Sequence, residues 1–356
     1  MITVELSPDL YTQIQDLINR KQYLSVENFV EISLQNQLTL EKSHQLTAKT
    51  IPFTTTKSDV LSSLGGIIKE LDEAMEIPTS VQTSEAISID EKRKKDPIGG
   101  LINRLLPSKI VLRMLALQLA NKNSQWIDYK EFCEFVVTKS IQLRLQIERQ
   151  ERKLDVTRGE SLKVGLPLKD TKSQQRFINF YIGKVKSDGS FDGILGDLEL
   201  GVIKKHYHDG IYSTIIGITK DGLGLAKLHS PVLDDVLRNG KRLSTPLSNE
   251  ETLFLLQQIK RVRPGEFEFL NLVFKLIENG SDNPTALNRN IQDYFISNNF
   301  STASLKSILV GCIGRLVEMK IIKIRKNGVY TNYQPNINAN LLAKVTSLPN
   351  MDAREL

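Results

Sequence analysis

The residues best suited to bind a ligand form a short basic stretch near the end of the chain. Four basic residues gather there, at Lys320, Lys323, Arg325 and Lys326, and no Asp or Glu occurs from Lys320 to Tyr333. Lysine and arginine are the usual partners of phosphate oxygens. We therefore expect this stretch to bind the phosphates of a nucleic acid. The alternative is a hairpin edge that is kept charged to prevent edge-to-edge aggregation.

The elements around this stretch are predicted to be three helices and a hairpin. The pattern favours helices over Pro264–Asn279, from Pro284 after the cap Asn283, and over Thr302–Met319 after the cap Ser301. Strand-like segments Lys320–Lys326 and Val329–Tyr333 flank Asn327-Gly328, a strong signal for a two-residue hairpin turn. Three helices followed by a two-stranded hairpin resemble a winged-helix domain, which we assign to residues 246–340.

The winged-helix resemblance implies that the third helix enters the major groove of DNA while the hairpin, or wing, lies along the backbone. It therefore assigns DNA contacts to the helix face opposite the predicted core, at Ser304, Lys306, Ser307 and Arg315. Arginine is the commonest base reader, because it binds guanine through two hydrogen bonds. Gly311 and Gly314 lie on the same face and are costly within a helix, so either DNA or a neighbouring helix should approach closely there.

An earlier block, residues 98–245, ends in a similar way. The segment Leu195–Ile203 resembles Cys312–Ile322 and is followed by a second hairpin signal, Asp209-Gly210, between strand-like segments. We therefore expect a second winged-helix domain in this block. Its wing would offer two further phosphate contacts, Lys204 and Lys205.

The N-terminal residues 1–42 follow a different pattern. Met1–Leu6 alternates apolar and polar residues like a half-buried strand, and two short amphipathic helices follow it. One strand and two helices are too small to bury a core alone, so we expect two chains to pair their strands. The region resembles a ribbon-helix-helix domain, whose outward strand residues read DNA. Thr3 fits that role, whereas the carboxylate of Glu5 is repelled by phosphates.

Charge favours dimerisation as the first role of this N-terminal region. Residues 1–42 hold three basic and six acidic side chains, whereas a DNA-reading face should be basic. The resemblance therefore implies a homodimer first and a DNA contact at Thr3 second. Residues 43–97 are predicted to be a linker with one possible helix, and residues 341–356 a tail.

The amino-acid composition limits the classes of protein to which the chain can belong. The chain of 356 residues has 40% hydrophobic and 25% charged residues, which is ordinary for a globular protein, with no apolar run long enough to span a membrane. We expect a cytoplasmic location, because there is no signal-peptide pattern and two separate cysteines suit a reducing compartment. The net charge of +6 is uneven: residues 1–100 hold 10 basic and 15 acidic side chains. Any polyanion should therefore bind the later two-thirds.

Signals for catalysis and cofactors are weak. Gly222-Leu-Gly224 lacks the rest of a dinucleotide site, and no phosphate-binding loop or nucleophile motif is present. His206 and His208 are spaced to share a metal, but no Cys or acidic cluster accompanies them. We therefore predict no enzyme activity, cofactor or metal site.

The interpretation is a protein that is mainly α with small β elements: a ribbon-helix-helix domain plus two winged-helix (helix-turn-helix) domains. The function predicted from this fold is a homodimeric, sequence-specific regulator of transcription that binds double-stranded DNA. Two alternatives stay open. Tandem winged helices also resemble plasmid replication initiators, which bind origin repeats, and the acidic front half would suit a scaffold that binds a protein partner.

Overall fold

A computed structural model of the chain describes residues 81–152, 161–186, 191–208, 211–237, 245–292, 294, 302–327 and 330–349, together with Gln15 and Val26. The chain divides into two compact units, Met1–Gly66 and Ile67–Leu356. Gln15 and Val26 are both helical. Apart from these two residues, the predicted ribbon-helix-helix domain, including Thr3, lies outside the described residues.

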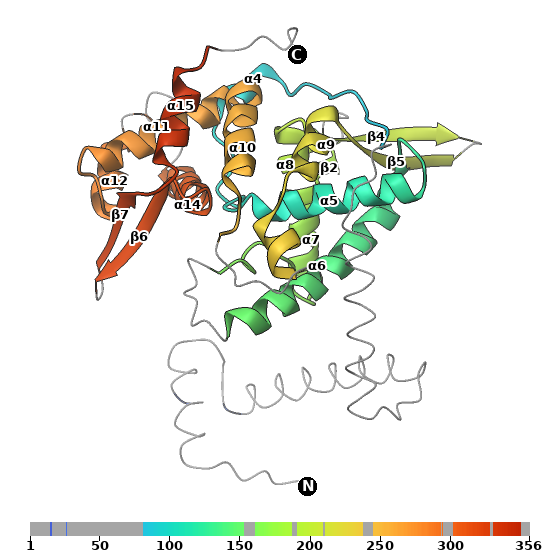
Figure 1. Ribbon diagram of the computed structural model, residues 1–356, viewed down its shortest axis with the longest axis horizontal. Coiled ribbons are helices and arrows are strands. Elements are labelled where there is room, and N and C mark those ends of the chain that lie inside the picture. The colour runs from blue at the N-terminus through green and yellow to red at the C-terminus, as the bar shows by residue number, and fades with distance from the viewer. Residues whose placement is uncertain are drawn as a thin grey trace. The chain divides into compact units, whose positions relative to one another are not determined.

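The described part of the second unit is mainly helical with small antiparallel sheets, as the sequence predicts (Figure 1). The helices are α4 (Glu91–Lys95), α5 (Leu106–Asn121), α6 (Tyr129–Glu151), α7 (Thr171–Phe177), α8 (Ile194–Asp197), α9 (Lys220–Lys227), α10 (Asn249–Val262), α11 (Pro264–Glu278), α12 (Pro284–Asn290), α14 (Thr302–Glu318) and α15 (Ala339–Ser347), with π-helical segments η1 (Ile178–Ile182) and η2 (Pro231–Leu237). The strands are β1 (Ile127–Asp128), β2 (Lys184–Val185), β3 (Phe191–Asp192), β4 (Gly201–His208), β5 (Ile211–Ile218), β6 (Ile322–Asn327) and β7 (Tyr330–Pro335).

The first half of this unit is organised around a three-stranded sheet of order β1-β5-β4. Helix α6 begins where predicted, because the Asp128 side chain accepts a hydrogen bond from the Glu131 backbone N–H at 2.9 Å. The short strand before this helix, β1, pairs antiparallel with β5, which places Ile127 opposite Ile216. On the other side of β5, Ile203 of β4 also lies opposite Ile216. The three isoleucines are buried and fix the sheet on the helical core.

The second half has a similar pairing between the residues before a helix and a hairpin strand, but it is shorter. Helix α12 begins at Pro284 because Asn283 caps it, as predicted, by accepting a hydrogen bond from the Ala286 N–H at 2.9 Å. Just before the cap, the Asp282 carbonyl accepts a hydrogen bond from the N–H of Tyr333 in β7 at 2.6 Å. In both halves, therefore, the residues that precede a helix pair with the returning strand of a hairpin.

The turn from helix to hairpin is also alike in the two halves. Glu199 after α8 and Lys320 after α14 have positive φ, 52° and 55° respectively, which non-glycine residues adopt uncommonly. The backbone N–H of the next residue donates to the carbonyl oxygen five residues earlier. The distance is 2.8 Å from Leu200 to Leu195 and 2.9 Å from Ile321 to Leu316. This is the hydrogen bond of a Schellman helix end. The sequence similarity of the two segments thus extends to their backbones.

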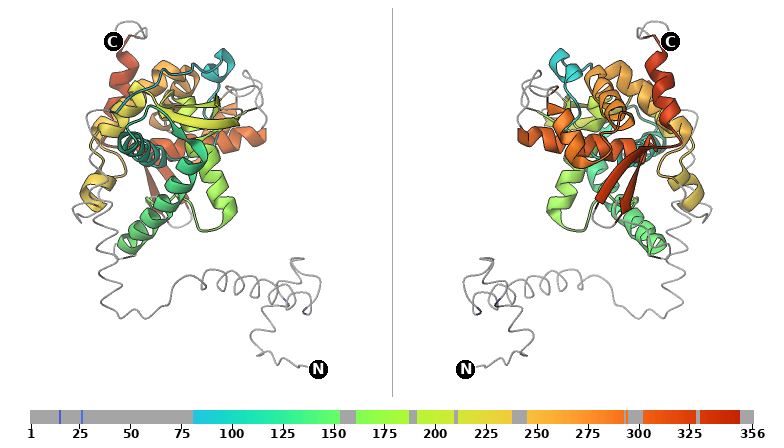
Figure 2. Two further views of the ribbon diagram at one scale, coloured as in Figure 1. Left: turned by 90° about the vertical axis from the view of Figure 1, so that its right-hand side faces the viewer. Right: turned by 90° about the vertical axis from the view of Figure 1, so that its left-hand side faces the viewer.

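The two halves share one hydrophobic core. A single cluster of buried residues includes members from both 98–245 and 246–340, so the packing is continuous across the predicted boundary at 245. Helix α10 lies at this junction and packs against α9, α11 and α15 (Figure 2). The division that the structure shows, between Gly66 and Ile67, falls instead within the predicted linker.

Segments predicted to flank the folded domains are part of the core. In the predicted linker 43–97, Val81 and Ile89 are buried, and Arg93 of α4 donates to Asp192 at 3.2 Å. The predicted tail, 341–356, begins inside α15, whose Leu342 and Val345 are buried. The prediction is wrong for residues 81–97, because this segment has few large apolar residues and part of its attachment is polar and reaches distant parts of the chain. Residues 43–80 of the predicted linker lie outside the described residues.

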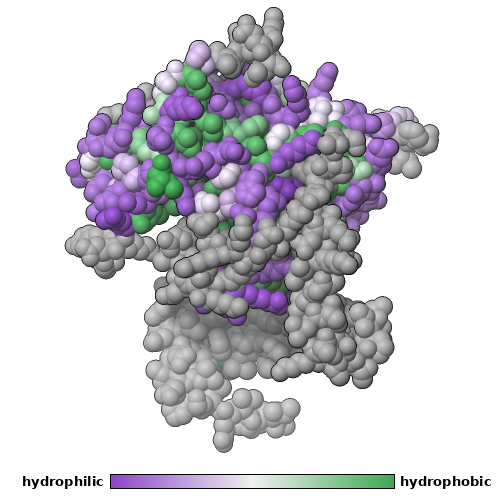
Figure 3. Space-filling model, viewed as in Figure 1, coloured by the Kyte–Doolittle hydropathy of each residue, from purple (hydrophilic) through white to green (hydrophobic). Residues whose placement is uncertain are grey.

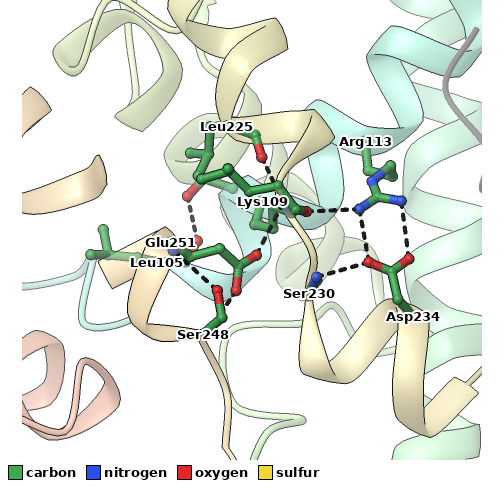
Figure 4. Close-up of polar contacts among 10 residues, drawn as sticks. Leu105, Lys109, Arg113, Leu225, Ser230, Asp234, Ser248 and Glu251 are labelled. Carbon is green, nitrogen blue, oxygen red and sulfur yellow. Dashed lines mark hydrogen bonds and ion pairs between the residues drawn. The ribbon is translucent and has the colours of Figure 1, made fainter. Parts of the chain in front are cut away.

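A buried ion pair connects the first half to α10 at the junction of the two halves (Figure 4). Lys109 of α5 and Glu251 of α10 are both fully buried and lie 3.0 Å apart. The Lys109 ammonium also donates to the carbonyl oxygens of Leu225 and Leu228, each at 2.6 Å. Burial lowers the pKa of Lys109 to about 8, because the charged form loses its hydration. These contacts hold α5, the end of α9 and the start of α10 together.

Candidate nucleic-acid interface

The β6–β7 hairpin presents a basic and amide-rich outer face. Lys323 and Arg325 lie two residues apart on β6, on the side opposite to the buried Ile322. Gln334 lies opposite Lys323 in the register, and Asn332 lies opposite Arg325. Arg325 is exposed and the other three polar residues are partly exposed. The four side chains can donate hydrogen bonds to phosphates or base edges.

Asn332 and Gln334 were missed by the reasoning from sequence. The signal that identifies them is the two-residue period of a strand combined with the hairpin register. The observed register places Asn327 opposite Tyr330. Counting outward in steps of two from this pair then places both amides on the face of the basic residues.

Two further basic residues flank the outer face. Lys320 occupies the positive-φ turn between α14 and β6 and is partly exposed. Lys326 belongs to β6, next to the end of the strand, and its side chain is outside the described structure. The predicted basic stretch is therefore gathered on one hairpin and the turn that leads into it.

Helix α14 exposes its small polar residues near the N-terminus. Ser304, Lys306 and Ser307 are exposed, and Val310 is 64% exposed one turn further along. Three of the four residues predicted to contact DNA from this helix are thus at the surface.

Arg315, the predicted base reader, lies in the core instead. Its side chain is 0% exposed, and its Nη2 and Nε atoms lie 2.8 and 2.9 Å from Oε1 of Glu266 in α11. It also donates to the carbonyl oxygens of Ile98 and Ile102. Because these partners are inside the fold, the guanidinium does not reach a base edge. We therefore remove Arg315 from the set of DNA contacts.

Gly311 and Gly314 mark the place where residues 99–105 cross α14. A Cβ atom added to Gly311 would lie 2.6 Å from Cα of Gly100, and one added to Gly314 would lie 2.6 Å from the carbonyl oxygen of Asn103. The structure shows close packing at these glycines. The partner is the non-helical segment that leads into α5, and not the neighbouring helix that the sequence suggested.

We expect Gly311→Ala to lower the free energy of unfolding by about 1–3 kcal/mol, because the added methyl group forces two backbones apart. Intrinsic helix propensity alone would favour alanine by about 1 kcal/mol. The matched control is Gly224→Ala in α9, where the added Cβ would lie 3.5 Å from Phe254, an ordinary contact. Urea denaturation of both variants measures the difference. A Gly311→Ala protein as stable as wild type would show that the crossing can relax.

The β4–β5 hairpin carries the other predicted phosphate contacts. Lys204 and Lys205 are both exposed. The Lys204 ammonium lies 4.0 Å from the ring centroid of Trp126, which is a cation–π contact, and Lys205 faces Thr214 in the register. This hairpin and the β6–β7 hairpin lie at different ends of the unit (Figure 1). The structure therefore forms two separate basic hairpins.

On the face shown in Figure 3, hydrophilic residues cover much of the described surface, with groups of hydrophobic residues between them. Cys133 and Cys312 are buried free thiols, and burial raises the pKa of Cys133 to about 12. Within the described residues no group of three or more His, Cys, Asp and Glu is placed to hold a metal ion. No helix in that part of the chain is long and apolar enough to cross a membrane.

Comparison of the chain with protein families, with curated proteins and with solved structures found no match.

Proposed function

We propose that this protein is a double-stranded DNA-binding regulator of transcription built from two winged-helix units. The observation that carries the proposal is the outer face of the β6–β7 hairpin, where Lys323 and Arg325 lie beside Asn332 and Gln334. Positive charge binds the backbone of a duplex, and amides and arginine can read base edges in its grooves.

The connectivity supports winged-helix units in both halves. In each half, the residues just before a helix, β1 in one and Asp282 in the other, pair with the returning strand of a hairpin. In each, a helix then leads into that hairpin through a Schellman turn. A hairpin fixed in this way on a helical core is a rigid support for groove contacts.

In the proposed winged-helix domain of residues 246–340, we assign base recognition to the accessible residues of α14 and of the β6–β7 hairpin. Lys306 and Ser307 are exposed on the first turns of α14, and Ser304 lies beside them. Because Arg315 is buried, these residues and the two amides of β7 are the proposed readers. Lys320, Lys323, Arg325 and Lys326 are the proposed phosphate contacts, with Lys204 and Lys205 on the other hairpin.

We also propose that residues 1–42 pair two chains, so that a dimer binds a paired DNA site, with Thr3 as a groove contact. Dimeric DNA-binding proteins match the symmetry of their sites to their own two-fold axis. The proposed location is the cytoplasm, in association with the nucleoid.

The test is binding to a labelled generic duplex of about 30 base pairs, measured by fluorescence anisotropy at two salt concentrations. The variant Lys323→Ala/Arg325→Ala/Lys326→Ala should bind at least about tenfold more weakly. Its slope of log affinity against log salt should fall by about 2–3, because each phosphate contact contributes about 0.9.

The matched control replaces three exposed lysines outside both hairpins, Lys130, Lys169 and Lys172, with alanine. It removes the same net charge but should leave the salt slope nearly unchanged. If both variants behave alike, binding depends on net charge and not on the hairpin. If the wild-type protein does not bind duplex at low salt, the DNA proposal fails and the scaffold alternative takes its place.

A plasmid-type replication initiator is the second candidate. The observation that favours it is the presence of two hairpin-bearing halves in one compact unit, since a single chain can then contact two successive segments of one duplex (Figure 1). Footprinting on a selected site separates the candidates. Protection of direct repeats favours an initiator, and protection of one inverted site favours a dimeric regulator.

A further inference from the structure

Two tyrosines form an exposed aromatic pair near the end of the β4–β5 hairpin. Tyr207 and Tyr212 lie directly opposite each other in the register, with ring centroids 4.6 Å apart and an interplanar angle of 45°. They remain 60% and 75% exposed. Cross-strand aromatic pairing accounts for the contact between the rings. It leaves their outer faces in water, although large aromatic side chains usually bury most of their surface.

The neighbours of this pair on β4 and β5 are basic or neutral. On the same face, one step of two residues toward the core, Lys205 lies opposite Thr214. Lys204 and His206 occupy the other face of β4. The strand residues 201–208 and 211–218 include no Asp or Glu, and the one acid between them in the sequence is Asp209.

We infer that the β4–β5 hairpin binds unpaired bases of a single-stranded nucleic acid by stacking them on Tyr207 and Tyr212. Every base has a π-face that stacks on an aromatic ring, and positive charge nearby holds the backbone. In a duplex these π-faces are covered by the neighbouring base pairs. Exposed tyrosine rings can therefore stack only on bases that are unpaired or have been turned out of the helix.

The spacing of the rings defines how a base is held. Because the two rings already touch, a base adds to the outer face of the pair and does not enter between them. A strand rises about 3.4 Å per residue, so Lys205 lies about 7 Å from Tyr207 along β4. Its flexible side chain can then bind a phosphate next to the stacked base.

Binding of unpaired bases is an activity separate from duplex binding at the β6–β7 hairpin. The two hairpins lie at different ends of the unit (Figure 1). Lys205 is a proposed phosphate contact in both activities, but Tyr207 and Tyr212 are not among the proposed duplex contacts. Removal of the two rings can therefore abolish binding of unpaired bases and leave duplex binding in place.

The test uses full-length protein and labelled oligonucleotides of about ten nucleotides, oligo-dT and oligo-U, followed by anisotropy. The double variant Tyr207→Ala/Tyr212→Ala should lose about tenfold to a hundredfold in affinity for them. The control Tyr207→Phe/Tyr212→Phe keeps both rings and should bind within about twofold of wild type. If the alanine variant loses the same affinity for oligo-dT and for oligo-U, the site recognises the bases and not the sugar. A loss for only one of the two identifies whether the natural strand is DNA or RNA.

Three results would overturn the inference. These are no oligonucleotide binding by the wild-type protein, equal affinity in the alanine variant, and a loss in the phenylalanine variant as large as in the alanine one. Thermal melting checks that the alanine variant is folded. Its affinity for duplex at the β6–β7 hairpin should be unchanged, which separates this outcome from a failure of the proposed function.

Discussion

Replacement of Arg315 by alanine should lower the free energy of unfolding by about 3–5 kcal/mol. The reason is that the change leaves the buried carboxylate of Glu266 without its charged partner. Glu266 is fully buried, and its carboxylate accepts from Arg315 and, at 2.8 Å, from the N–H of Ile98. Without the guanidinium, the protein must either bury an unpaired charge or protonate Glu266, and burial already raises the pKa of that carboxyl group.

The same change removes a connection between distant segments. Arg315 in α14 donates to the carbonyl oxygens of Ile98 and Ile102, so it also holds the segment that crosses the helix. Those carbonyls would lose a charged donor inside the core, which adds to the cost. We therefore expect the crossing of residues 99–105 to loosen together with the helix.

Urea or guanidinium denaturation measures this effect. The control is Arg325→Ala, which removes an exposed arginine from the hairpin and should change stability by no more than about 0.5 kcal/mol. The double variant Arg315→Met/Glu266→Gln should recover much of the loss, because it removes both charges and keeps an acceptor for Ile98. A loss below about 1 kcal/mol in Arg315→Ala would contradict the role assigned to the pair.

Stability should fall as pH rises from about 5 to 7.5, in large part because of Glu318. This residue near the end of α14 accepts hydrogen bonds from the N–H groups of Leu105 and Leu106 at the start of α5. Burial of its carboxyl group raises its pKa from 4.5 to about 7, because the charged form loses hydration.

The sign follows from proton binding. Between pH 4.5 and 7 the folded protein holds a proton on Glu318 that the unfolded chain has released. The stabilisation is complete below the pKa in the unfolded chain and is lost as pH rises through the pKa in the folded protein. A raised pKa of this size corresponds to about 3 kcal/mol in full, of which about 2–3 kcal/mol is lost between pH 5 and 7.5.

The comparison of wild type with Glu318→Gln isolates this contribution. The variant loses a constant amount of stability, since one backbone N–H lacks an acceptor, but its pH dependence should be flatter by about 2–3 kcal/mol over this range. Glu268→Gln, on the exposed side of α11, is the control and should follow wild type. Measurements stop near pH 7.5 because Lys109, with a pKa of about 8, begins to titrate above it. Parallel curves for wild type and Glu318→Gln would contradict the assignment.

Local features of the sequence determined most of the secondary structure. The caps Asp128 and Asn283 began α6 and α12 as predicted, because each satisfies a free backbone N–H in the first turn and needs only its neighbours to do so. The alternation of β6 likewise determined that Lys323 and Arg325 share the face away from the core. Such information lies within a few residues and can be read without the rest of the chain.

Only the tertiary structure decided what covers α14. Its helical periodicity placed Arg315 and the two glycines on a face that looked open, because the third helix was expected to meet DNA there. In the folded chain that face meets residues 99–105, more than 200 positions earlier, and the buried carboxylate of Glu266. A buried arginine and an exposed one look the same in the sequence, and only the partner that arrives through the fold distinguishes them.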